Sequence, residues 1–505
     1  MCINYTTTQT ILPLDLGSFL PHNHLVFTVE KVVNELDDTL FKGFYHKEGR
    51  PSYHPKMLLA ALLFAYTQGI FSGREIEKMM AESIPMQYVT GQSIVSYRTI
   101  NRFRISQDMD KLISDLFIQL NLRLKMEELI NMECLYIDGT KIEANANKYT
   151  FVWKKATEKF SARLQDNLCS YFQEEINSLI QEAIMLDEQK AITSEQLAEF
   201  SQLLEEELKT VEHDIEENPV KGKDSRKANH RKLKKILRKV KDDFSVRAEK
   251  YEIYLDTFKG RNSFSKTDTD ATFMRMKEDH MMNGQLKAAY NLQIATENQF
   301  VLHYDVFPNP TDTLTLLPFL ETYPHNLKTV VADAGYGSEE NILKLDEAGV
   351  SHYIKYNQFD REQKRSFQKR AVNWTYDEGT DTYQHPDGFL YPFSHTKYHK
   401  TASGFKQEIK VYLTEEPEAT PQKGLYINER YQQLKQKESQ ALLSDQGRAI
   451  FAKCKVDVEP VFGQIKACLG YTRCNLRGRR KVKIDMGLVL MANNLKKYNR
   501  RMTKN

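Results

Sequence analysis

Three acidic residues, far apart in the chain, stand in settings that suit metal chemistry. Asp138 follows the apolar run LYI, Asp333 follows the apolar run VVA, and Glu459 precedes a proline in VDVEPVFG. Clustered carboxylates hold pairs of divalent ions in enzymes that act on phosphodiester bonds. If the three acids converge in the fold, we expect a divalent-metal site that cuts or joins nucleic-acid strands.

Each acid also has a plainer explanation. A buried strand-end carboxylate is costly unless a metal or partner compensates it, but such an aspartate can also cap the next turn. The glycine-rich stretch AGYG after Asp333 favours a ligand site at a strand end. Glu459 at a first helical turn can simply complement the helix dipole. Spacing alone leaves both interpretations open for each residue.

Basic residues follow Glu459. In a continuous helix, Gly463 and Lys466 would share the face of Glu459, so Lys466 could reach a phosphate near the metal. A solvated lysine is the alternative. A dense basic run then follows, for which phosphate contact is the natural use. The run consists of Arg473, Arg477, Arg479, Arg480, Lys481 and Lys483.

Residues 1–125 are predicted to form a compact helical N-terminal domain. Pro55 can start one helix and Ser96 can cap another. This succession of short helices is similar to a helix-turn-helix unit. The last helix would display three arginines to DNA; an ordinary bundle with solvated arginines is the alternative. These arginines are Arg98, Arg102 and Arg104.

The remaining elements predict a mixed α/β core with two insertions. Core segments are expected at 130–148, 259–359 and 430–500, and 130–148 is expected to be a strand hairpin that turns at Gly139-Thr140. Residues 149–258 predict a helical hairpin with a turn near Asn218-Pro219. Its first arm is acidic and its second arm, 221–241, is basic. The basic arm either exposes its charges to solvent or contacts phosphates of DNA. Residues 360–429 predict a β-rich insertion, in which Trp374 either lies in the core or stacks on an unpaired base.

Bulk composition sets broad limits. The chain has 505 residues, a formal net charge of +3 and six cysteines without a CxxC pair. Scattered cysteines favour a reducing cytoplasm. We see no leader peptide, and the longest apolar run, MLLAALLFAY, is too short to span a bilayer. These features predict a cytoplasmic protein that does not bind membranes.

Several long sequence segments resemble those of the DDE transposases of bacterial insertion sequences, in the group with an InsH-type helical N-terminal domain. The matching words include LYIDGTKIEANANKYTFVWKKA, VVADAGYGSEENI and VDVEPVFGQIKACLGYTRCNLRGRRKVKIDMGLVLMANNLKKY. The resemblance implies a ribonuclease-H-like catalytic core with Asp138, Asp333 and Glu459 as the catalytic, metal-binding acids. It also implies Mg²⁺, with Mn²⁺ as a substitute, and a homodimer that pairs the terminal inverted repeats of the element and joins them to target DNA. Such a protein would be associated with the nucleoid.

Two positions depart from the pattern of the family. Family members often carry a Tyr and an Arg shortly before the glutamate, where this chain has Phe451 and Cys454; Lys453 or Lys455 could replace the lost arginine. These departures keep open a catalytically impaired, transposase-derived DNA-binding regulator. A nuclease outside any mobile element is a further alternative.

Overall fold

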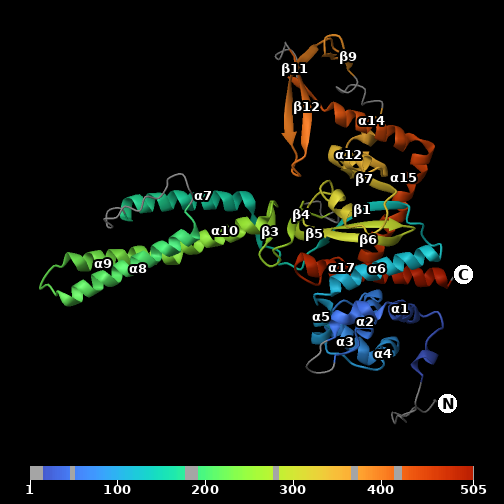
Figure 1. Ribbon diagram of the computed structural model, residues 1–505, viewed down its shortest axis with the longest axis horizontal. Helices are drawn as coiled ribbons and strands as arrows, with labels where there is room; N and C mark the ends of the chain where they lie inside the picture. The colour runs from blue at the N-terminus through green and yellow to red at the C-terminus, as the bar shows by residue number, and fades with distance from the viewer. Residues whose placement is uncertain are drawn as a thin grey trace, which may run out of the picture. The chain divides into compact units, whose positions relative to one another are not determined.

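The computed structural model describes residues 15–45, 52–176, 192–276, 284–364, 374–414 and 423–503. The chain divides into two compact units (Figure 1). The first comprises Met1–Asn145, Met276–Asn283 and Ala289–Asn505, and the second comprises Ala146–Arg275 and Gly284–Ala288. The architecture is mixed α/β, as expected.

A central sheet organises the first unit. Five of the six strands of this sheet are, in spatial order, β6 (Phe300–Phe307), β5 (Leu286–Glu297), β1 (Cys134–Glu143), β7 (Thr329–Gly337) and β8 (Ser351–Tyr356). β6, β5 and β1 are antiparallel neighbours, whereas β7 and β8 run parallel to β1. Asn298 and Gln299 turn β5 into β6 with φ values of 53° and 65°, which suits a tight two-residue hairpin.

The hairpin expected within 130–148 is wrong. β1 continues through Gly139 and Thr140, and both residues pair with β5. Gly139 marks a close approach rather than a turn, because a Cβ there would collide with the Gln293 side chain. The hairpin partner of β1 is therefore β5, which follows about 140 residues later in the chain.

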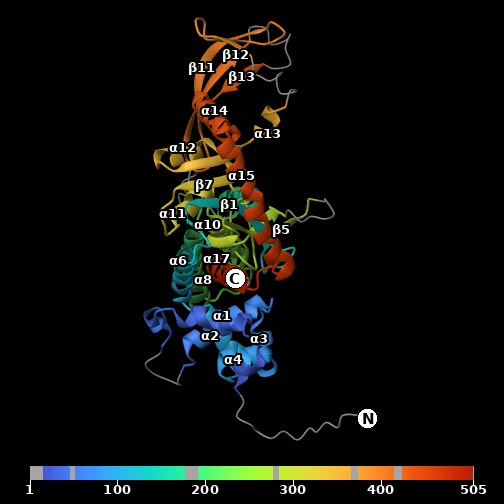
Figure 2. The ribbon, with the colours of Figure 1, turned by 90° about the vertical axis from the view of Figure 1, so that its right-hand side faces the viewer.

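Helices cover the sheet (Figures 1 and 2). α6 (Met109–Met126) and α17 (Arg479–Met502) pack on β6, and α15 (Asp445–Asp457) packs on β1 and β7. α14 (Glu429–Leu443) packs on β8. α12 (Glu339–Glu347) begins as predicted after Ser338, whose hydroxyl accepts a hydrogen bond from Asn341 N. Helices α12 and α14 thus pack on the part of the sheet formed by β7 and β8.

The N-terminal segment consists of short helices, as predicted. They are η1 (Leu16–Phe19), α1 (Leu25–Asn34), η2 (Asp38–Phe44), α2 (Pro55–Thr67), α3 (Gly73–Glu82), α4 (Ile84–Thr90) and α5 (Tyr97–Arg104). α2 is buried almost throughout because it packs on α1, α4 and α17. No described helix is long and apolar enough to cross a membrane.

Residues 374–414 and 423–427 form the predicted β-rich insertion. Its sheet has the order β13 (Gly424–Ile427), β12 (Lys406–Leu413), β11 (Leu390–Lys400), β10 (Thr382–Gln384) and β9 (Thr375–Asp377). Trp374 is 6% exposed and packs with Tyr391, Tyr412 and Leu425. The core interpretation of Trp374 therefore agrees with its environment.

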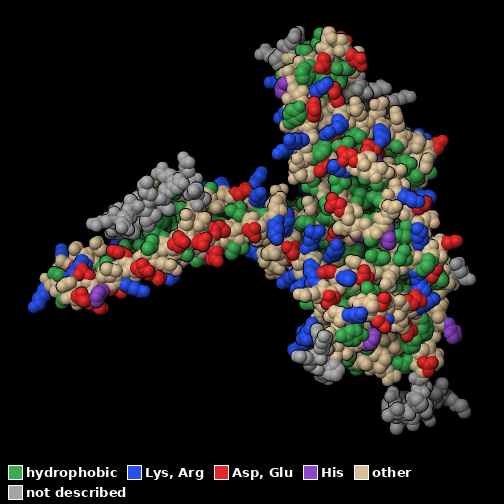
Figure 3. All heavy atoms as spheres, viewed as in Figure 1, with side chains coloured by type: hydrophobic (Ala, Val, Ile, Leu, Met, Phe, Trp, Pro, Cys, Tyr) green, Lys and Arg blue, Asp and Glu red, His purple; other side chains and the backbone are tan. Residues whose placement is uncertain are grey.

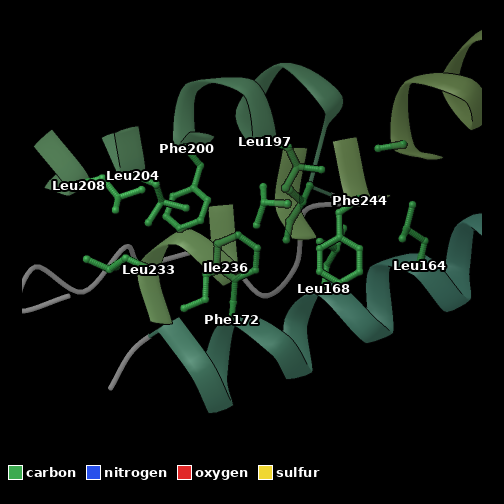
Figure 4. Packing of buried hydrophobic residues seen from close by; sticks show 13 residues of the cluster. Leu164, Leu168, Phe172, Leu197, Phe200, Leu204, Leu208, Leu233, Ile236 and Phe244 are labelled. Atoms are coloured by element: carbon green, nitrogen blue, oxygen red, sulfur yellow. The ribbon is translucent and has the colours of Figure 1, made fainter. Parts of the chain in front are cut away.

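The second unit contains the predicted helical hairpin, with its turn between Glu217 and Ser225. Its helices are α7 (Lys154–Tyr171) with the π-helix η3 (Phe172–Ile176), α8 (Ser194–Glu217), α9 (Ser225–Lys239) with the π-helix η4 (Val240–Ser245), and α10 (Val246–Phe258). Short strands β2 (Phe151–Trp153), β3 (Ser263–Ser265) and β4 (Thr272–Arg275) complete it. Phe172, Phe200, Leu204 and Ile236 belong to its apolar core (Figure 4).

Opposite charges face each other across this hairpin. Lys241 bonds Glu205 at 2.7 Å, and Arg226 bonds Asp214 at 3.0 Å. Figure 3 shows acidic and basic side chains intermixed along the visible face of these helices. Part of the positive charge of 221–241 is therefore neutralised within the unit.

Candidate active site

Asp138 and Asp333 lie on neighbouring parallel strands at the same level. The pairing of β1 with β7 runs as far as Ile137 opposite Ala332, so the two aspartates are the next residues on each strand. Side chains at matching positions of paired strands project from the same face, and neighbouring strands are about 4.8 Å apart. The sheet therefore brings these two acids together.

Local backbone bonds hold both carboxylates where the pairing of β1 with β7 ends. Gly139 N donates to Asp138 Oδ1 at 2.7 Å, and Gly335 N donates to Asp333 Oδ1 at 2.9 Å. Asp138 is half-buried and Asp333 is exposed. Both aspartates thus keep one side toward solvent, where a ligand can reach them.

Glu459 enters from the C-terminal helices. It begins α16 (Glu459–Gly463) with Pro460 in the first turn, as the sequence predicts, and it is exposed. The preceding helix, α15, packs on β1 and β7, and its last residue, Asp457, accepts a hydrogen bond from Gln299 N at 2.9 Å. The junction between α15 and α16 is therefore anchored to the sheet.

The buried thiol of Cys454 is a common neighbour of the three acids. Burial and, after it, the negative charges of Asp138, Asp333, Asp457 and Glu459 together raise the pKa of Cys454 to about 12. Electrostatic influence falls with distance, so each of these carboxylates must lie near the thiol. Cys454 is thus a shared neighbour of the acids from β1, β7 and α16.

Within the described residues, no three His, Cys, Asp or Glu side chains already form a closed ligand set. The donors nevertheless suit a hard divalent cation, because all are carboxylate oxygens, the ligands that Mg²⁺ and Mn²⁺ prefer. The chemistry of the acids fits such ions, while their side chains are not yet arranged around one.

Sequence reasoning missed Asp312. Its Oδ1 accepts hydrogen bonds from Asn291 Nδ2 at 2.7 Å and from Gln293 Nε2 at 2.8 Å. Its carboxylate lies beside Gly139 and Gly335, close to both aspartates. The segment NPTDT shows no apolar run before this acid, so no pattern distinguished it from a loop residue.

Lys466 lies beside β1. Its Nζ donates to Thr140 Oγ1 at 2.8 Å and to Lys141 O at 3.2 Å, just beyond Asp138. The π-helix η7 (Gln464–Cys468) follows α16 directly, so the α-helical spacing expected from Glu459 to Lys466 is not kept. Lys466 comes near the acids through its contact with β1.

Arg473 and Arg477 are exposed and anchored to the chain that follows β1. Arg473 Nε donates to Ala144 O at 3.3 Å, and Arg477 Nε donates to Asn145 O at 2.7 Å. Others of the basic run have partners inside the unit: Arg479 bonds Val306 O and Lys483 bonds Asp305. Arg473 Nε also lies 3.8 Å from Glu143 Oε1.

The three arginines of α5 differ in environment. Arg98 and Arg102 are exposed, whereas Arg104 is 4% exposed and donates to Tyr66 Oη and Phe71 O at 2.9 and 2.8 Å. Asp485 of α17 accepts from Tyr66 Oη in the same cluster. The expected DNA contact of Arg104 therefore finds no support, because its guanidinium is engaged in the core.

The two departures before Glu459 occupy different surroundings. Phe451 packs beside Tyr356 and Phe359, with Lys355 Nζ 4.8 Å from its ring centroid. Lys453 and Lys455, on either side of Cys454, are exposed. Neither departure removes a carboxylate from the site.

Two family models match parts of the chain. Residues 262–495 match the Transposase DDE domain, and residues 14–106 match the Transposase domain (DUF772). The first match includes Asp333 and Glu459, whereas Asp138 precedes it. Together the two matches define a transposase. The chain belongs to the insertion-sequence DDE transposases of the InsH-like type. Searches of curated proteins and of solved structures give no match.

Proposed function

We propose that this transposase binds the terminal inverted repeats of its insertion sequence and catalyses metal-dependent strand cleavage and strand transfer. The observation that carries the proposal is the matching register of Asp138 and Asp333 on β1 and β7, with Glu459 near the same buried thiol, Cys454. Three carboxylates from separate elements on one side of a sheet are what a divalent-metal nuclease needs.

The sheet supports a ribonuclease-H-like core. Three antiparallel strands, β6, β5 and β1, are followed by β7 and β8 parallel to β1, and the two aspartates come directly after the last paired residues of β1 and β7. Ligands of open α/β sheets commonly bind beyond such strand ends. The two insertions leave this strand order intact.

In the proposed mechanism, Asp138, Asp333 and Glu459 would hold Mg²⁺, with Mn²⁺ as a substitute. When bound, these ions supply an activated hydroxyl nucleophile and stabilise charge on the leaving oxygen. Lys466 bonds β1 beyond Asp138, and Arg473 and Arg477, whose side chains are exposed, would contact the DNA backbone. Two copies would pair the two ends of the element.

End recognition is assigned to the N-terminal helices. Arg98 and Arg102 are exposed on α5, and Arg74 of α3 lies 5.1 Å from the Tyr97 ring centroid beside them. These cations provide a positive surface for phosphate contact. A catalytically impaired regulator is not favoured, because all three acids are present together.

The test uses labelled duplexes that carry the inverted repeats found beside the gene. We expect the wild-type protein with Mg²⁺ to cut and join these ends, and Asp333→Asn to bind them without cutting. Asp377→Asn is a matched control, because Asp377 Oδ1 accepts from Gly379 N at 3.0 Å just as Asp333 accepts from Gly335 N. Equal cutting by both variants would contradict the proposal.

A further inference from the structure

A buried polar network lies beneath the site on β5 and β7. Tyr336 Oη donates to Gln293 Oε1, and Gln293 Nε2 donates to Asn291 Oδ1 at 3.0 Å and to Asp312 Oδ1 at 2.8 Å. Asn291, Gln293 and Tyr336 are at most 1% exposed. Buried polar side chains of this kind specify one arrangement when their bonds are satisfied.

The donors of this network end on one oxygen of Asp312. Because Gln293 Oε1 accepts from Tyr336, its Nε2 faces Asp312, where Asn291 Nδ2 also donates at 2.7 Å. Among the described residues, no hydrogen bond reaches Asp312 Oδ2. One oxygen is thus held by two amides and the other is available.

The backbone of Asp312 is fixed as well. Thr315 N and Thr315 Oγ1 donate to Asp312 O at 3.0 and 2.8 Å as α11 (Leu316–Glu321) begins. The next residue, Thr313, donates from Oγ1 to Gly335 O at 2.9 Å. The loop is therefore tied to the segment that follows Asp333.

Two glycines make room for the Asp312 carboxylate. A Cβ on Gly139 would lie 2.8 Å from Asp312 Oδ1. A Cβ on Gly335 would lie 3.0 Å from Asp333 Oδ1 and 3.4 Å from Asp312 Oδ2, so both oxygens lie within 3.4 Å of one point. The available oxygen of Asp312 therefore faces the same space as the carboxylate of Asp333.

We propose that Asp312 contributes a fourth carboxylate to the divalent-cation site, presented by the amides of Asn291 and Gln293. This inference rests on the proposed function. Four carboxylates match the charge of two divalent cations, and the fixed Oδ1 directs Oδ2 toward the space beside Asp333. Gathering a fourth like charge is unfavourable without a cation and favourable with one.

The experiment measures Mn²⁺ binding to the full chain without DNA, by isothermal titration, together with metal-free thermal unfolding. We expect Asp312→Asn to weaken Mn²⁺ binding by about 10–100-fold without lowering the metal-free midpoint. Asn291→Ser, which keeps the charge but removes one orienting donor, should weaken binding less. Cutting of end DNA by Asp312→Asn should recover partly at higher Mg²⁺ concentration.

The control is Thr313→Val, which removes the neighbouring bond to Gly335 O and leaves every carboxylate in place. Unchanged Mn²⁺ affinity in Asp312→Asn would overturn the inference, as would an equal loss in Thr313→Val. If Asp138→Asn and Asp333→Asn weaken Mn²⁺ binding but Asp312→Asn does not, only the role of Asp312 fails. If none of the three changes binding, the proposed function fails with it.

Discussion

The acids beside β1 and β7 and those of the hairpin of α8 and α9 have different surroundings. In the hairpin, Glu205 and Asp214 face Lys241 and Arg226. Beside β1 and β7, acids from three elements lie near one buried thiol. Neighbouring opposite charges stabilise the folded state, whereas like charges that the fold holds close together indicate a site for a cation.

The largest expected effect concerns Asp138 on β1. Asp138→Asn should reduce the rate of end cleavage at least about 1,000-fold, because about 4 kcal/mol of transition-state stabilisation depends on this ligand. Metal-free thermal stability should not fall, since a like charge is removed. Near-normal cleavage in Mg²⁺, measured with labelled end DNA, would place the site elsewhere.

A buried pair of opposite charges gives the contrasting case. Arg104 Nη1 lies 3.8 Å from Asp485 Oδ1, and both side chains are buried. Arg104→Met should lower the free energy of unfolding by about 3–5 kcal/mol, because it leaves Asp485 buried without its cation. Urea denaturation measures this change.

Arg102→Met provides the control on the same helix. Arg102 is exposed, so its substitution should change stability by less than about 0.5 kcal/mol. Equal effects of the two substitutions would show that the buried charge pair does not stabilise the junction of α5 with α17.

Apolar packing is expected to outweigh the ion pairs of the helical hairpin. Leu204 is 1% exposed within the core of the hairpin, so Leu204→Ala should lower the free energy of unfolding by about 2–5 kcal/mol. Leu203, its neighbour, is 56% exposed, and Leu203→Ala should lower the free energy of unfolding by less than about 0.5 kcal/mol. The extent of proteolysis within the second unit, measured as a function of urea concentration, would distinguish the two variants. Equal urea midpoints for both variants would contradict the packing described.

A buried histidine adds a pH dependence to the first unit. Burial lowers the pKa of His352, but bonds and charges from Glu438 and Asp346 outweigh it and raise that pKa. The contribution to stability is full below the ordinary value of 6.5 and is lost as pH rises through the raised pKa. The unfolding midpoint should fall over this range, and His352→Gln should remove this component. An identical pH profile for the variant would exclude His352 as its source.

The smallest effects concern DNA contacts. Arg98→Ala and Arg102→Ala should each reduce the slope of the logarithm of the end-binding constant against the logarithm of the salt concentration by about 1. This is the change expected for one lost phosphate contact. Lys241→Ala should leave the slope unchanged, because Lys241 already bonds Glu205. A larger change for Lys241 than for the α5 arginines would assign DNA binding to the helical hairpin.

Local patterns predicted much of this fold. The apolar runs before Asp138 and Asp333 became β1 and β7, and Pro460 began the helix of Glu459. These features depend on neighbours in the chain, which sequence reveals. The acidic and basic arms at 149–258 likewise became paired helices.

What the sequence could not reveal depends on distant partners. Gly139 was expected to turn the chain, but it lies within a strand because the Gln293 side chain needs its space. Arg104 was expected at the surface, but it meets Tyr66 and Asp485 from other helices. Asp312 became recognisable only once β5 and β7 placed it beside the two aspartates.

Iron-directed cleavage of the polypeptide tests most directly whether the three acids form one metal site. Fe²⁺ would replace the divalent ion, and ascorbate with peroxide would generate local radicals that cut nearby backbone. We predict cuts near residues 138, 333 and 459 in the same preparation, all suppressed by excess Mg²⁺ and all lost together in Asp333→Asn. Cuts near only one of these positions, or cuts that persist in Asp333→Asn, would contradict a single site built from β1, β7 and α16.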